Sequence, residues 1–483
     1  MSSETPIDVL IAGAGTAGIA CAIAAAEGGA RVLVAEKGAE IGGSLLVAGG
    51  KFSAGGTRRQ REQGIIDSPQ RHFDDVMRIS RGAADPLVVR LAVQEAPATV
   101  DWLDDLGFPF DPVTPTIDAF HRNRWTYSAP RTYWGPGPES TLRMAQTILA
   151  TIRPLWERQV SAGRIELALL TPLRSLERDQ RGAIQAVIGA SGNERSVDAG
   201  AIVLATGGYA SNLELFAELS GTGARPISWA RPTSTGDGII AARALGAAVR
   251  GGETYSPRAG ALEAAPGRAD DGYVRLLDRA EAPREIHVDA AGRRFHAEDD
   301  PSDRGLHRVF LERPGQCFWL VFDAATLADG ERIHSLLDAD ALRARAATSS
   351  NPWMADDVGE LGRRAGIDPA GLRATVRSWN DAIASGTPDQ LGRGGPRHAI
   401  ATPPFYALAT RLGVMSTPGG LAIDDELRVL DGDGVALGSL YAIGEILGSA
   451  ATMGDGSVSG MMVTPALSLG RILGRRLAAA LSP

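Results

Sequence analysis

The chain opens with two apolar runs of strand length on either side of an alanine-rich run of helical length. Residues 8–12 and 30–36 are the apolar runs, and residues 19–26 lie between them. Short, continuous apolar runs are typical of parallel strands that are buried on both faces of a sheet. The pattern therefore predicts a strand–helix–strand unit at the start of the chain.

The same reasoning predicts further elements along the chain. Residues 165–170, 201–204 and 438–442 have the pattern of strands, and residues 183–197 alternate like a hairpin. A helix is expected over 86–106, because Asp85 can cap it and Pro86 suits its first turn. Further helices are expected over 141–160 and 464–481, and Pro97 and Pro154 should kink the helices that contain them.

The character of the chain changes between residues 254 and 400. Acidic and basic residues alternate there, and helices with polar faces are expected over 324–338 and 355–366. We interpret 254–400 as a domain inserted into a larger one, which comprises 1–253 and 401–483. A length of 483 residues suits two domains.

Composition excludes several classes of protein. The hydrophobic content of 44% and the charged content of 22% are ordinary for a globular protein. The net charge is −8, and acidic and basic residues are interspersed, so the sequence shows no basic patch of the kind that binds nucleic acid. Cys21 and Cys317 are the only cysteines, so we expect free thiols and a cytoplasmic location. No apolar run has the length of a membrane span or the form of a signal peptide.

The turn after the first strand carries a phosphate-binding pattern. Gly13 permits a tight turn, Gly15 lets the backbone approach a pyrophosphate, and Gly18 lets the helix and strand pack closely. The positive end of the helix dipole would face the phosphates. Glu36, at the end of the second strand, can accept both hydroxyls of an adenosine ribose. The unit therefore predicts a dinucleotide site.

Several later segments favour FAD as the dinucleotide. A second glycine cluster at 41–50 follows the second strand, the segment 201–208 is a strand that runs into a glycine turn, and the segment 438–445 is a short strand that ends in Gly444 and Glu445. A second GxGxxG after a strand is missing, which argues against a separate NADPH domain. No metal site is expected. The predicted cofactor residues are Gly13, Ala14, Gly15, Ala17, Gly18, Glu36, Lys37, Gly42, Gly43, Ser44, Ala48, Gly49, Gly50, Leu173, Ala205, Thr206, Gly207, Gly208, Asp237, Glu445, Gly460, Met462 and Val463.

These segments together resemble the FAD-dependent fumarate reductase and 3-ketosteroid dehydrogenase superfamily. The resemblance implies an α/β fold, with a Rossmann-like FAD-binding domain and an inserted α+β domain that caps the substrate. Some members attach FAD through a histidine, and Leu45 stands at that position here. The resemblance therefore implies non-covalent FAD.

Three segments are expected to line the substrate pocket. The first, residues 121–134, is rich in aromatic and cationic side chains. The second, residues 288–304, resembles the superfamily signature through Gly292, Arg294, Phe295 and Glu298, and we expect Arg294 and Glu298 to form a structural ion pair. The third, residues 453–460, is the segment with which the superfamily holds substrate beside the flavin.

The residues at these positions differ from those of fumarate reductases. Ser457 stands where fumarate reductases carry an arginine that clamps a dicarboxylate, and Ser416 or Thr417 stands where they carry a histidine. Ser302 replaces their proton-delivering arginine, and Arg304 follows two residues later. Because a dicarboxylate needs cationic partners, these changes argue against fumarate and succinate. The resemblance is closer to the ketone-desaturating dehydrogenases.

The leading hypothesis is a flavin-dependent dehydrogenase that desaturates a carbon–carbon bond next to a carbonyl, in a 3-ketosteroid or a smaller cyclic ketone. A base would remove the α proton while hydride leaves to flavin N5. Donors at the carbonyl oxygen would stabilise the enolate, and the candidates are Ser457, Ser459 and the Gly460 amide. Candidate bases are Tyr127 and Tyr133, whose pKa a neighbouring Arg124 or Arg131 would lower, and His121, His296, Ser302 and Arg304 are further candidates for proton transfer.

Three points stay open. Arg124 or Arg131 could hold the carboxylate of an oxo-cyclohexanecarboxylate. The reaction could run in reverse, as an enone or enoate reductase, and FAD could instead be a non-catalytic ligand. Because the chain has neither a haem-attachment motif nor a set of cluster cysteines, electrons should pass to or from an external partner such as a quinone, oxygen or a flavoprotein.

Overall fold

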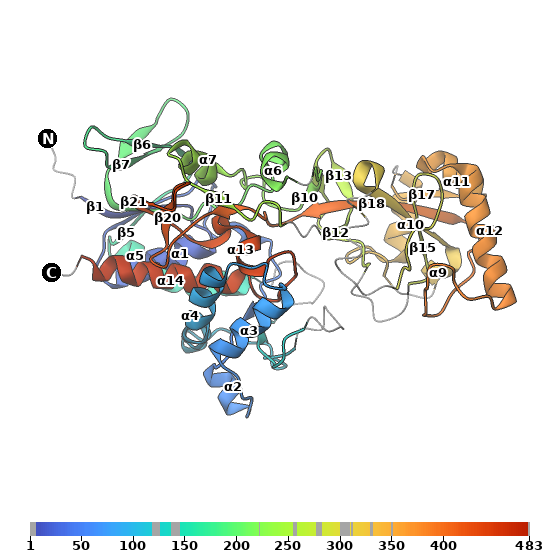
Figure 1. The fold of residues 1–483 in the computed structure, drawn as a ribbon, viewed down its shortest axis with the longest axis horizontal. Helices are drawn as coiled ribbons and strands as arrows, with labels where there is room; N and C mark the ends of the chain where they lie inside the picture. Colours follow the sequence, from blue (N-terminus) through green and yellow to red (C-terminus); the bar gives the residue numbers. More distant parts are fainter. Residues whose placement is uncertain are drawn as a thin grey trace.

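The fold is a computed structural model that describes residues 6–117, 126–136, 145–221, 223–254, 258–276, 283–299, 310, 313–328, 332–348 and 351–481. Two sheets lie side by side along its long axis (Figure 1).

The first sheet has the strand order β20-β21-β9-β1-β2-β5. All its neighbouring pairs are parallel except β20 with β21, and Val9 pairs with Val32 and Ala201. The predicted strand–helix–strand unit is confirmed, as is the α/β class. The bounds are β1 Ile7–Ala12, β2 Val32–Ala35, β5 Ile165–Ala168, β9 Ala199–Leu204, β20 Arg428–Leu430 and β21 Ala436–Ala442.

Helix α1 (Thr16–Glu27) packs along the last helix, α14 (Val463–Ala479) (Figure 1). Two glycines of α14 allow this approach. A Cβ at Gly470 would lie 2.5 Å from the Ala17 carbonyl oxygen, and one at Gly474 would lie 2.4 Å from the Cys21 carbonyl oxygen. The two ends of the chain are therefore held against each other.

Two further predicted helices are present. Helix α4 (Pro86–Asp105) begins as predicted, because Asp85 Oδ1 accepts a hydrogen bond from Leu87 N at 2.8 Å, and it continues through Pro97. Helix α5 (Gln146–Ser161) contains Pro154. Of the described helices, none combines the length and apolar character needed to cross a membrane.

The predicted hairpin belongs to a three-stranded antiparallel sheet beside the first sheet. Its strands are β6 (Leu173–Arg178), β7 (Ile184–Ile188) and β8 (Arg195–Val197).

The second sheet is built around two long antiparallel strands, β16 (Cys317–Asp323) and β18 (Phe405–Val414). Side chains alternate between its faces, with Phe318 and Leu320 in one apolar core and Val321 in another. The other strands are β10 Ile227–Ser228, β12 Arg258–Ala261, β13 Glu263–Ala265, β14 Arg268–Ala269, β15 Ile286–Val288 and β17 Trp353–Ala355.

Helices cover both faces of this sheet. Leu342 of α10 lies in the first core, and Leu361 of α11 and Leu372 of α12 lie in the second. The bounds are α9 Ala324–Ala328, α10 Ala339–Thr348, α11 Val358–Ala365 and α12 Pro369–Ser385. The division into domains at 254 and 400 stays a prediction.

The helix expected over 324–338 is wrong. Helix α9 ends at Ala328, and Ile333 and Ser335 instead exchange backbone hydrogen bonds with the segment 273–275. Asp338 then caps α10, since its Oδ1 accepts from Ala341 N at 2.9 Å. Long-range backbone pairing overrides the local helical pattern here.

Short elements connect these layers. They are η1 Gly43–Leu46, β3 Phe52–Ser53, α2 Arg58–Glu62, α3 Pro69–Ile79, β4 Thr132–Tyr133, α6 Leu213–Ser220, α7 Asp237–Ala244, β11 Val249–Arg250, η2 Pro314–Gln316, β19 Gly420–Leu421, η3 Gly444–Leu447 and α13 Ser449–Met453.

A buried ionic network fixes the β3–β4 ladder. The Arg131 side chain is fully buried, and its Nε and Nη2 donate to the two carboxylate oxygens of Asp67 at 3.0 and 2.9 Å. Its Nη1 lies 3.0 Å from Asp75 Oδ2. Two carboxylates and backbone groups therefore surround the guanidinium.

Replacing this arginine should destabilise the protein strongly. Arg131→Ala leaves two buried carboxylates without their cation, so we expect the free energy of unfolding to fall by about 3–5 kcal/mol. Chemical denaturation measures this. The matched control is Arg363→Ala, which removes an exposed pair with Glu360 and should cost less than about 1 kcal/mol. Equal effects of the two substitutions would contradict this interpretation.

Candidate functional site

Many of the predicted cofactor residues follow the carboxyl ends of parallel strands. Strands β1, β2, β9 and β21 run parallel and end beside the segments 13–18, 36–37, 205–208 and 443–445. Ligands of open α/β sheets bind outside this edge. The sheet therefore brings together residues from both ends of the chain.

The first glycine turn has the geometry that its pattern predicts. A Cβ at Gly13 would lie 2.4 Å from the Ala205 carbonyl oxygen, and one at Gly18 would lie 1.9 Å from the Gly13 carbonyl oxygen. At Gly15 a Cβ would meet nothing within 4 Å. Gly13 and Gly18 are thus required for packing, whereas Gly15 borders open space at the start of α1.

The second glycine cluster lies against the first. Gly42 N donates to the Ala14 carbonyl oxygen at 2.8 Å, and a Cβ at Gly43 would lie 3.0 Å from Gly15 Cα. Leu45 is buried behind this contact. The predicted residues Ser44, Ala48, Gly49 and Gly50 follow between this contact and β3.

Acidic and basic side chains flank the end of β2. The Glu36 carboxylate accepts hydrogen bonds from Ala14 N at 2.8 Å and Gly38 N at 2.6 Å. The Lys37 ammonium pairs with Asp237 Oδ2 at 2.8 Å. The Glu36 carboxylate therefore contacts the glycine turn, and the predicted residues Lys37 and Asp237 contact each other.

The ends of β9 and β21 form the other wall. A Cβ at Gly208 would lie 2.3 Å from Thr417 Oγ1 and 2.6 Å from Glu445 Oε1. Burial raises the pKa of Glu445 to about 7, although a hydrogen bond from Thr417 N opposes the rise. A partly buried carboxyl beside a glycine turn is suited to hydrogen-bonding a ligand's hydroxyl groups.

This edge fits a dinucleotide in two ways. Open space lies over Gly15 and also over Gly207, whose φ is +75°. In addition, the hydroxyls of Thr206 and Thr417 are buried and have no hydrogen-bond partner among the described residues. A long polar ligand would satisfy these hydroxyls, so the residues fit FAD.

The C-terminal loop is fixed to β3. Thr464 Oγ1 accepts from Ser53 N at 2.7 Å and donates to the Ser53 carbonyl oxygen at 2.9 Å. Gly460 has φ +78°, and a Cβ there would lie 2.5 Å from Ser53 N. Ser457 and Ser459 are partly exposed on this loop, next to the start of α14 at Met462 and Val463.

Tyr127 lies under this loop. Its side chain is 4% exposed and belongs to an apolar cluster with Val458 and Met461. Its hydroxyl donates to the Ser459 carbonyl oxygen and also lies 3.4 Å from His72 Nε2. Burial lowers the pKa of His72 well below its usual value, and the charge of Arg131 adds to the lowering, so His72 is neutral.

The expected activation of Tyr133 by an arginine is wrong. Tyr133 is fully buried, its hydroxyl bonds Thr57 Oγ1 at 2.7 Å, and burial raises its pKa above the usual value. Arg131 is committed to Asp67 and Asp75, so it cannot also hold a substrate carboxylate. The Lys51 ammonium lies 5.4 Å from the ring centre of Trp134, just beyond this ladder.

The predicted ion pair in the second sheet is present. Arg294 donates to Glu298 through Nε at 2.8 Å and through Nη2 at 2.6 Å. Arg393, whose side chain is fully buried, also donates to Glu298, at 3.3 Å, and Arg294 binds Asp389. A network of this kind supports the structure.

His296 lies beside that network. Its Nε2 is 2.8 Å from His287 Nδ1. Burial is the main cause that lowers the pKa of His296 to about 3, with smaller effects of His287 and Arg294. A neutral imidazole with this pKa is a poor proton acceptor at neutral pH. The candidates His121, Arg124, Ser302 and Arg304 lie outside the described residues.

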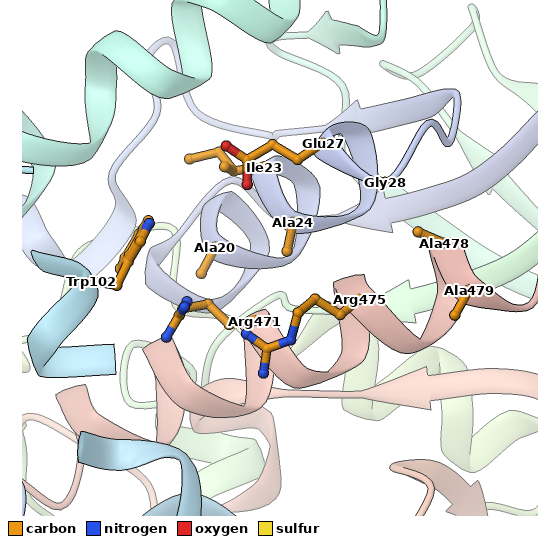
Figure 2. A pocket seen from close by; sticks show the side chains of 10 residues that line it. All are labelled: Ala20, Ile23, Ala24, Glu27, Gly28, Trp102, Arg471, Arg475, Ala478 and Ala479. Carbon is orange, nitrogen blue, oxygen red and sulfur yellow. The ribbon is translucent and has the colours of Figure 1, made fainter. Parts of the chain in front are cut away.

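Figure 2 shows a pocket elsewhere, lined by α1, α14 and Trp102, where Arg471 and Arg475 lie near the small side chains of Ala20 and Ala24. Arg471 and Arg475 both pair with Glu95, at 3.1 and 2.7 Å, and Arg471 stacks on Trp102. These contacts account for the two arginines there, and Glu27 also lines the pocket. None of the predicted site residues lines this pocket.

Sequence reasoning missed Thr464, His72 and Arg393. The partner of Thr464 lies 411 positions away, and that of Arg393 lies 95 positions away. His72 carried a weak signal, as a histidine on the apolar side of an amphipathic helix. No local sequence pattern identifies the hydrogen-bond partner of any of these three residues.

Two known proteins are similar to this chain in sequence, and a solved structure is similar to it in fold. The chain is 27% identical to a probable fumarate reductase of Shewanella frigidimarina, over 98% of this chain and 74% of that one. It is 26% identical to the 4-oxocyclohexanecarboxylate 2-dehydrogenase of Sinomonas cyclohexanicum, over 98% of this chain and 92% of that one. Its fold matches the 3-ketosteroid Δ1-dehydrogenase of Sterolibacterium denitrificans with a TM-score of 0.76 at 21% identity, covering 99% of this chain and all of that one.

The family model for an FAD binding domain matches residues 8–458. This range includes the glycine turn, the second glycine cluster and the wall formed by Glu445. The chain therefore belongs to the FAD binding domain family, and it is an FAD-dependent oxidoreductase.

Proposed function

We propose that the protein desaturates a carbon–carbon bond next to the carbonyl of a cyclic ketone. The observation that carries the proposal is the chemistry of the loop at 457–460. It offers two hydroxyls and a backbone amide, all uncharged, beside the start of α14. Neutral donors suit a ketone oxygen that gains negative charge, whereas a dicarboxylate requires cations.

The cofactor would be held by the residues at the strand ends. Gly13 to Gly18 would face the pyrophosphate, Glu36 the ribose, and Glu445 with Thr206 the hydroxyls further along. When bound, FAD accepts or supplies the hydride. Leu45 stands where a linking histidine would be needed, which supports non-covalent binding.

The chain's own residues would hold the carbonyl and remove the proton. Ser457, Ser459 and the Gly460 amide would donate to the carbonyl oxygen and so acidify the α carbon. Because Tyr133 is buried and bonded to Thr57, the proton acceptor is better sought among the remaining candidates, His121, Ser302 and Arg304. We propose that residues 254–400 form the cap that covers this site, and that an external acceptor reoxidises the enzyme.

A second candidate function is the reverse reaction, the reduction of an enone or enoate. The identity to a probable fumarate reductase supports it as much as the identity to a dehydrogenase supports desaturation. The same neutral donors would polarise the carbonyl of an enone.

Anaerobic mixing separates the two directions. Oxidised enzyme mixed with saturated cyclic ketones, including 4-oxocyclohexanecarboxylate, should lose its flavin absorbance as the ketone is desaturated. Chemically reduced enzyme mixed with the corresponding enones measures the reverse reaction. Loss of flavin absorbance with succinate, but with none of the ketones, would contradict the proposal.

Ser457 can be tested directly. Ser457→Ala removes one donor to the carbonyl oxygen, so turnover should fall on the order of 100-fold while FAD occupancy and melting temperature hardly change. The control is Ser468→Ala, a buried hydroxyl that bonds Thr99. It should cost about 1 kcal/mol of stability and leave turnover unchanged. Full turnover in Ser457→Ala would remove Ser457 from the site.

The raised pKa of Glu445 predicts a pH effect on stability. A carboxyl with a folded-state pKa of about 7, above its unfolded value, contributes stability at low pH and loses that contribution as pH rises towards 7. Glu445→Gln should therefore remove part of the decline in the apoprotein's free energy of unfolding between pH 5 and 8, at most about 3 kcal/mol. Denaturation curves at both pH values measure this decline. The same pH dependence of the free energy of unfolding in the wild type and in Glu445→Gln would refute the prediction.

A further inference from the structure

The peptide that joins Ser459 to Gly460 has its two polar atoms in different surroundings. Its carbonyl oxygen accepts a hydrogen bond from Tyr127 Oη at 2.5 Å. Its N–H has no hydrogen-bond acceptor among the described residues. Since this peptide is trans and planar, the N–H points away from the carbonyl, and so away from Tyr127.

Contacts on both sides prevent this peptide from turning. Gly460 lies so close to β3 that a Cβ would be 2.5 Å from Ser53 N. The Gly460 carbonyl oxygen accepts from Thr464 N at 2.9 Å, and Thr464 Oγ1 bridges the backbone of Ser53. The direction of the Gly460 N–H is therefore set by the fold.

Tyr127 is itself held in place. Its ring packs with Val458 and Met461, and the Arg131 guanidinium lies 5.0 Å from its centre. Ser53 Oγ lies 3.2 Å from the hydroxyl oxygen. A hydrogen bond in such a buried place is stronger than one in water.

A hydrogen bond to a peptide carbonyl polarises the whole amide. Electron density moves towards the carbonyl oxygen, and the N–H of the same amide becomes a better donor. Tyr127 thus acts on one end of the peptide, and the effect appears at the other end, at the Gly460 N–H.

We propose that Tyr127 is a positioning residue that aligns and strengthens the Gly460 N–H as a donor to the substrate's carbonyl oxygen. The inference rests on the proposed function, in which that amide binds a ketone. It assigns Tyr127 a role different from that of a base, because its hydroxyl proton is directed at Ser459. The effect should be largest when the carbonyl oxygen carries negative charge.

Binding of phenols to the FAD-loaded enzyme tests this without turnover. A phenolate imitates an enolate, and a neutral phenol of similar shape imitates the uncharged ketone. Dissociation constants follow from the change in flavin absorbance on titration. We expect Tyr127→Phe to weaken phenolate binding about tenfold, to change neutral phenol binding little, and to retain full FAD occupancy.

The matched control is Tyr133→Phe. It makes the same chemical change at a buried tyrosine whose hydroxyl bonds Thr57 instead of the loop. We expect it to leave the preference for phenolate unchanged. Replacement of Tyr127 by a difluorotyrosine keeps the ring and strengthens the donor. It should tighten phenolate binding, and it provides a test should Tyr127→Phe fold poorly.

The outcomes distinguish a failure of the role of Tyr127 from a failure of the proposed function. Equal phenolate affinity in wild type, Tyr127→Phe and the fluorinated variant, together with flavin bleaching by a ketone, would overturn the role of Tyr127 and leave the proposed function intact. A wild-type protein that binds no phenolate and is bleached by no ketone would overturn both.

Discussion

The candidate site depends on one junction, where the hydroxyl of Thr464 bridges the backbone of Ser53. These residues are 411 positions apart, and their two hydrogen bonds join the segment after the second glycine cluster to the start of the last helix. Gly460 completes the junction, because any larger residue would collide with β3. The close packing of α1 on α14 gives a second contact between the N-terminal part of the chain and the last helix.

Several buried cations among the described residues serve the structure by pairing with carboxylates. Arg131 pairs with Asp67 and Asp75 beside β3 and β4. In the second sheet, Arg294 pairs with Glu298 and Asp389, and Arg393 pairs with Glu298. Burial makes each of these cations dependent on its partner carboxylate. The loop at 457–460 carries hydroxyls and an amide instead, and this supports the proposal of a ketone over a dicarboxylate.

Much of the FAD-binding fold could be predicted because its signals are local. The apolar runs around 8–35 specify parallel strands, and the spacing of Gly13, Gly15 and Gly18 specifies the turn between them. The same holds for the capped helix that begins at Pro86. The helix expected over 324–338 failed because backbone pairing with 273–275, a distant segment, overrode a local pattern.

The details of the site were harder to predict for the same reason. The aromatic and cationic residues of 121–134 indicate a special loop, but only the fold shows that Arg131 and Tyr133 face inward while Tyr127 reaches the loop at 459. The direction of a pKa shift depends on burial, which raises the pKa of Tyr133 where the sequence suggested a decrease. Pairings such as Arg393 with Glu298 have no sequence signature.

The central claim is that neutral hydrogen-bond donors beside the cofactor hold a ketone oxygen. The most direct measurement is the infrared stretching frequency of a carbonyl, labelled with carbon-13, in a cyclic ketone or its unsaturated product bound to the FAD-loaded enzyme. The account predicts a shift to lower frequency on binding, because donors to the oxygen weaken the carbon–oxygen double bond. A frequency equal to that in an apolar solvent would contradict it.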